Sequence, residues 1–167
     1  MTSSTQDSSS PQGDKVTPAL YSAEEVIRNF EALMDSLDFK AELMELGIGS
    51  LQLGRRKKTL RELKALSIGL WSLALQRSFP QDAAAFFAEF RERSPRLVGS
   101  GKEPGLLQSR VGIYVDLLKD KKETDFLPVA SYLAEVLALD AEDMRRLRLK
   151  VSLITRSLYK LIFDRLV

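Results

Sequence analysis

The chain has 167 residues, of which 44% are hydrophobic and 29% charged, and this near-average composition fits one folded domain with a single core. It contains neither histidine nor cysteine, so it lacks the side chains that perform most nucleophilic, general-base and transition-metal chemistry near neutral pH. These absences argue against an enzyme and exclude disulfide bonds. The formal net charge of +2 averages separate acidic and basic blocks, whose positions say more about function than the sum does.

The N-terminal segment, residues 1–20, is the part of the chain least suited to folding. It is rich in Ser, Thr, Gln and Pro, and few of its residues are aliphatic. Because burial cannot offset its ordering entropy, we predict a disordered tail followed by one helical domain over residues 21–167. The longest mostly apolar run, 66–75, is too short to cross a bilayer, and residues 1–15 contain no apolar core that could serve as a secretory signal. We therefore expect a cytoplasmic protein without a transmembrane segment.

The first predicted helix begins at a capping box. Ser22 and Glu25 have the S-x-x-E spacing of this motif, and the helix meets no proline or glycine until Gly47. The glycine-rich stretch 47–54 and the basic run that follows it predict a loop. A second capping box, Thr59 with Glu62, predicts the start of the next helix.

The second predicted helix is apolar almost all round, which indicates a central, buried position for residues such as Trp71. A third helix is expected with Pro80 in its first turn and an end before Pro95, and three more follow at about 106–121, 124–139 and from 140 onward. No stretch alternates apolar and polar residues in the manner of a strand. The sequence thus predicts an all-α fold, a single compact bundle of about six helices.

Two sets of cations are candidate sites for an anionic partner. The first set is Arg55, Arg56, Lys57, Lys58, Arg61 and Lys64, and the second is Arg145, Arg146, Arg148, Arg156 and Lys160. Three interpretations apply to them: contact with nucleic-acid phosphates, attraction of the last helix to anionic lipid, and a solvated or internally paired surface. Neither set has interleaved aromatic residues, so stacking on single-stranded bases is not indicated.

An acidic stripe runs along the first predicted helix at spacings of four and three residues. It consists of Glu31, Asp35, Asp38, Glu42 and Glu45. Metal sites in helical bundles draw ligands from several helices and include histidine, so we predict a solvated face or a dock for a basic surface, and no metal site.

A glycine spacing typical of phosphate-binding loops occurs at Gly49 and Gly54. Arg55 and Arg56 stand where such a loop needs lysine and a hydroxyl residue, and the segment follows a predicted helix instead of a strand. We therefore predict no bound cofactor. No catalytic motif is present either, so no catalytic residue is assigned.

The segment 133–147, within a predicted hairpin over 129–150, resembles a helix-turn-helix. Ala134 is the small residue needed where two helices cross, and Ala138 stands where such turns usually carry glycine. Glu142 and Asp143 depart from the pattern because they would present acid to DNA phosphates. The resemblance covers too few residues to identify a family.

The sequence as a whole predicts a non-catalytic helical interaction protein that binds another macromolecule through charged helical faces. We expect a protein partner. DNA binding by the hairpin 129–150 is the alternative, and a small helical enzyme acting without histidine or cysteine comes third. The pattern favours no particular oligomeric state.

Overall fold

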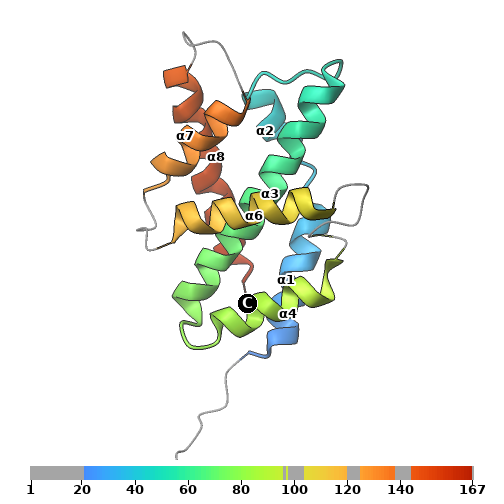
Figure 1. Ribbon diagram of the computed structural model, residues 1–167, viewed down its shortest axis with the longest axis vertical. Coiled ribbons are helices and arrows are strands. Elements are labelled where there is room, and N and C mark those ends of the chain that lie inside the picture. Colours follow the sequence, from blue (N-terminus) through green and yellow to red (C-terminus); the bar gives the residue numbers. More distant parts are fainter. Residues whose placement is uncertain (1–20, 96, 98–103, 120–124, 138–143, 167) are drawn as a thin grey trace, which may run out of the picture.

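The computed structural model describes residues 21–95, 97, 104–119, 125–137 and 144–166, and within these residues it contains seven helices and no strand (Figure 1). The helices are α1 (Ala23–Ser36), α2 (Lys40–Glu45), α3 (Leu53–Ser78), α4 (Ala83–Arg93), α6 (Pro104–Leu118), α7 (Leu127–Leu137) and α8 (Met144–Asp164). They pack around one core, which confirms the predicted all-α bundle. The tail expected at 1–20 lies outside the described residues. None of the described helices is both long and apolar enough to cross a membrane.

Helix α3 is the central helix of the bundle. It packs most extensively against α6, which crosses it, and then against α8 and α4 (Figure 1). Every residue from Ala65 to Leu75 is buried, as the apolar pattern around this helix predicted. Gly69 lies at the contact with α6, where a β-carbon would stand 2.9 Å from Cβ of Tyr114. The glycine therefore sets how closely the two helices approach.

An aromatic cluster joins α3 to α1 and α4. Trp71 is fully buried, which confirms the prediction from sequence. Its ring stacks on Phe30 at a centroid distance of 4.5 Å, and Phe90 meets it edge-on at 4.8 Å. Rings in these arrangements stabilise one another beyond the area that they bury.

The prediction of one continuous helix from Ser22 to Gly47 is wrong. The capping box does form, with the Ser22 hydroxyl accepting from the Glu25 amide at 3.3 Å, but α1 ends at Ser36 and α2 begins only at Lys40. An Asp38 oxygen accepts a hydrogen bond from the Lys40 amide at 3.0 Å, a local bond that competes with helical continuation. Phe39 adopts a left-handed conformation with φ of 53°, and the break turns this residue into the core. The five carboxylates of the predicted acidic stripe therefore do not share one continuous helix.

The start of α3 also differs from the prediction. The helix begins at Leu53, so the basic run that we expected in a loop forms its first turns. Arginine and lysine are good helix formers, and they outweigh the glycine at 54. Thr59 is not a cap: its hydroxyl donates to the Arg55 carbonyl at 2.9 Å within the helix. Glu62, expected to complete a capping box, is buried.

Candidate functional surfaces

Helix α8 turns an apolar side to the core and a mixed basic and apolar side outward. Its buried residues are Leu147, Val151, Ile154, Thr155, Leu158, Tyr159 and Ile162. The residues on the opposite side are exposed, and we call six of them the outer face of α8: Arg145, Arg146, Leu149, Leu153, Arg156 and Lys160. Phe163 and Asp164 continue this side at the C-terminal end of the helix. Four of the five cations of the predicted second basic patch thus lie on one face.

Two leucines interrupt the cations of this outer face. Leu149 is 63% exposed and Leu153 is 53% exposed. With Arg156 and Lys160 they follow spacings of four, three and four residues, which places all four side chains in one row along the helix. Such a row is typical of a helix that packs against another segment. Sequence analysis missed the leucines, although their positions off the apolar stripe could have revealed them.

Two further cations of α8 lie beside the outer face. Arg148 is exposed, but its spacing places it on the side of Val151 and Thr155, so the predicted patch loses this member. Lys150 donates a hydrogen bond to the Glu45 carbonyl at 2.9 Å and links α8 to the end of α2.

The basic patch predicted at the start of α3 is divided by the fold. Lys57 and Lys64 are exposed and share a side of the helix with Leu53, whereas the other four members are half-buried. One of these four, Arg56, acts on a residue of the acidic stripe. Hydrogen bonds from Lys40 lower the pKa of Asp38, and the charge of Arg56 adds to this shift.

The first basic patch and the N-terminal part of the second lie at the same end of the molecule but on different surfaces. Figure 1 shows the N-terminal ends of α3 and α8 at one end of the long axis. Helix α8 packs against α3 with its buried side, so its outer face points away from α3. The structure therefore does not join the two patches into one site.

A second group of exposed apolar side chains surrounds the connection between α2 and α3. Met44 is 78% exposed, Leu51 is 95% exposed and Leu53 is 74% exposed. We call these three residues the α2–α3 tip. Leu51 and Leu53 closely precede the cations of α3 in the chain, and neither was singled out from the sequence. Met44 was expected on the apolar stripe of the first predicted helix, and its 78% exposure shows that this expectation is wrong.

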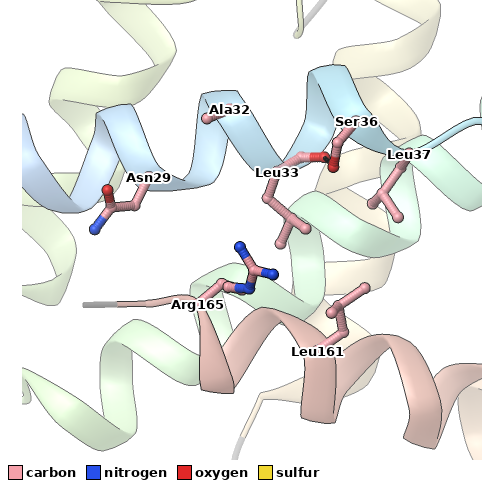
Figure 2. A pocket seen from close by; sticks show the side chains of 7 residues that line it. All are labelled: Asn29, Ala32, Leu33, Ser36, Leu37, Leu161 and Arg165. Carbon is pink, nitrogen blue, oxygen red and sulfur yellow. Dashed lines mark hydrogen bonds between the residues drawn. The ribbon is translucent and has the colours of Figure 1, made fainter.

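A groove of about 580 Å³ separates α1 from the C-terminal end of α8 (Figure 2). Leucines from both helices line it, together with a few polar side chains; the lining residues are Asn29, Ala32, Leu33, Ser36, Leu37, Leu161 and Arg165. Figure 2 shows the guanidinium group of Arg165 reaching into the space between the helices. The groove therefore combines apolar walls with one cation, the same combination as the outer face of α8.

A buried polar cluster connects α3, α6 and α7. Glu62 is fully buried, and one of its carboxylate oxygens lies 3.2 Å from Nε of Arg110. The other accepts a hydrogen bond from the Tyr114 hydroxyl at 2.9 Å, and Arg110 also donates to the Tyr132 hydroxyl. Burial, followed by the negative charge of Glu62, raises the pKa of Tyr114 well above its usual range. The members of this cluster pair with one another, so we assign it to stability.

Sequence analysis missed this cluster because it interpreted Glu62 as a helix cap. The signal was present: Glu62 is an acid in a helix whose other sides are apolar. Within the described ranges, no group of three or more acidic side chains is placed to hold a metal ion. Comparison of the chain with protein-family models, with curated proteins and with solved structures finds no match.

Proposed function

We propose that this protein is a non-catalytic interaction protein whose helix α8 binds an acidic segment of a protein partner. The observation that carries the proposal is the outer face of α8, where two solvent-exposed leucines stand in one row with Arg156 and Lys160. Exposed leucines within a row of cations fit a partner that offers apolar side chains flanked by carboxylates. Such a partner would bury the leucines and pair the cations.

The groove beside this face supports the same chemistry of partner. Leu161 is 36% exposed on the groove side of α8, and Arg165 reaches into the groove from the turn after the helix. A partner segment that extends from the outer face into the groove would again contact a leucine, Leu161, and a cation, Arg165. Leucine and cation therefore occur together both on the outer face and in the groove.

DNA binding by the hairpin 129–150 is the alternative function. It is favoured by the packing of α7 against α8 and by the exposure of Arg145 and Arg146 in the first turn of α8. The turn of the hairpin, residues 138–143, lies outside the described residues. The two exposed leucines favour the protein partner, because leucines in the middle of the face do not pair with phosphates.

Photo-crosslinking in the source cell tests the proposal. A photoreactive amino acid replaces Leu153 in the full chain, and a second variant carries it at Leu127, which is 60% exposed at the start of α7 and serves as the matched control. We expect a specific protein adduct from position 153 and none from position 127. The double variant R156E/K160E should abolish the adduct without lowering Tm, because exposed charges contribute little to stability.

Two outcomes contradict the proposal: equal adducts from both positions, or an adduct at 153 that survives the charge reversal. A mobility-shift assay with duplex DNA tests the alternative. Binding that weakens steeply with rising salt and disappears in the variant R145E/R146E supports the DNA-binding function instead.

A further inference from the structure

We propose that the α2–α3 tip and the adjoining cations of α3 form a peripheral anchor for anionic lipid bilayers. The apolar side chains of the tip enter the interface, and the cations contact lipid phosphates. This inference is independent of the proposed function, because it uses a different surface and different residues.

The fold holds the apolar side chains of the tip outward. Leu46 and Ile48 are buried on one side of the connection, and the Ile48 amide donates to the Leu43 carbonyl at 2.9 Å. The Gln52 amide then donates to the Gly49 carbonyl at 3.2 Å, which closes a turn directly around Leu51. With its flanks fixed in this way, Leu51 keeps 95% of its surface in solvent. Exposed leucines on an anchored turn are placed to meet an external apolar phase.

The charges around the tip match an anionic surface. Glu42 and Glu45 flank Met44 on α2, but from residue 46 to residue 61, which includes Leu51 and Leu53, the chain contains five cations and no acidic residue. On α3, Leu53, Lys57 and Lys64 are all exposed and lie on one side of the helix, so an apolar contact and two cationic contacts can be made together. Apolar side chains beside lysines and arginines are the combination by which peripheral proteins bind anionic membranes.

The position of the tip favours a bilayer over a protein partner. Figure 1 shows the connection between α2 and α3 at one end of the long axis, where it leads directly into the first turns of α3. A bilayer accepts projecting leucines without a complementary pocket, whereas a protein partner needs one. Since none of the described helices can span a membrane, the contact is an interfacial one.

Co-sedimentation with vesicles tests the anchor. The full chain is mixed with vesicles of phosphatidylcholine alone, or of phosphatidylcholine and phosphatidylglycerol in equal parts, at low salt. We expect binding to the mixed vesicles only. The variant L51S/L53S should bind about 100-fold more weakly, since each leucine contributes roughly 10-fold through burial. The variant K57Q/K64Q should bind about 25-fold more weakly, from roughly 5-fold for each cation.

Matched controls remove a leucine and cations elsewhere. L127S replaces another exposed leucine, and R91Q/K119Q removes two exposed cations from α4 and the end of α6. Both controls should bind as the unmodified chain does. Circular dichroism and Tm of every variant confirm that the fold is retained.

Because the chain contains no cysteine, a fluorophore can be attached at a single introduced thiol, which gives a second measurement of membrane contact. A cysteine placed at Leu51 is the single thiol in the chain and can carry a polarity-sensitive fluorophore, with Leu127→Cys as the control. We expect a blue shift with the mixed vesicles at position 51 and none at position 127. The proposal is overturned if the mixed vesicles do not bind, or if L51S/L53S binds normally and position 51 shows no shift. It is also overturned if duplex DNA binds with the same dependence on Lys57 and Lys64 while the vesicles do not.

Discussion

The hydroxyl of Tyr114 on α6 donates a 2.9 Å hydrogen bond to the carboxylate of Glu62 on α3, and both side chains are fully buried. Arg110, one turn earlier on α6, supplies the charge that neutralises Glu62. This arrangement fixes the register of the two most extensively packed helices, because a shift of either helix would leave a buried carboxylate without its partners.

Removing the partner of Glu62 should therefore destabilise the fold. Arg110→Met leaves the carboxylate buried without its cation, and we expect the free energy of unfolding to fall by roughly 3 to 5 kcal/mol. The double variant with Glu62→Gln should lose clearly less than the sum of the two single variants, because it no longer buries a lone charge. Urea denaturation of the unmodified chain, the two single variants and the double variant measures the coupling between Glu62 and Arg110. Additive losses would contradict the pairing.

The raised pKa of Tyr114 predicts a loss of stability in alkaline solution. Burial and the Glu62 charge favour the protonated phenol in the folded state, so its stabilising contribution is complete below the ordinary tyrosine pKa of about 10 and decreases as the pH rises above it. Tyr114→Phe should make the alkaline decline in Tm shallower than in the unmodified chain. Its cost near neutral pH should be about 1 to 3 kcal/mol, from the hydrogen bond that Glu62 loses. An unchanged alkaline decline would argue against this role of Tyr114.

Gly69 and Gly112 should respond in opposite ways to the same substitution. A β-carbon at 69 would lie 2.9 Å from Cβ of Tyr114, so Gly69→Ala must push α6 away and should cost about 1 to 3 kcal/mol. At Gly112 in α6 a β-carbon meets nothing within 4 Å, and alanine there should stabilise the helix by up to about 1 kcal/mol. Thermal unfolding of the two variants decides this. Equal effects would show that α3 and α6 do not meet closely at residue 69.

Trp71 should report the integrity of the aromatic cluster. Its ring is fully buried between Phe30 and Phe90, so its fluorescence emission should lie well to the blue of a solvated indole. Trp71→Ala should destabilise the protein by roughly 3 to 5 kcal/mol, the usual cost of deleting a large buried aromatic side chain. Emission typical of an exposed indole in the native protein would contradict the central position of α3.

The sequence predicted the features of the fold that depend on periodicity. The all-round apolar pattern of α3 located the centre of the bundle, and the stripe along α8 identified its buried side. The prediction of one continuous first helix failed because the sequence pattern does not show where the fold interrupts a helix. Nothing near Phe39 marks a break with glycine or proline, and the left-handed turn places its side chain in the common core.

The candidate surfaces were predicted only in part, for a related reason. Lysines and arginines can be counted in a sequence, but whether Arg55 or Lys57 faces solvent depends on which helices cover α3. The exposed leucines were harder still, since Leu51 and Leu53 resemble core residues until the packing is known. Glu62 shows the converse: its type indicates a surface position, and its burial follows from Arg110 and Tyr114, which lie about fifty residues further along the chain.

The central position of α3 has a consequence for synthesis on the ribosome. The helix is made early, yet α6 and α8, which cover much of its apolar surface, are translated later. Until α8 has emerged, the nascent chain carries a long helix with uncovered leucines, and the link from Lys150 to the Glu45 carbonyl cannot form. The core is therefore completed late, and the uncovered leucines leave the nascent chain prone to aggregation until α8 has been made.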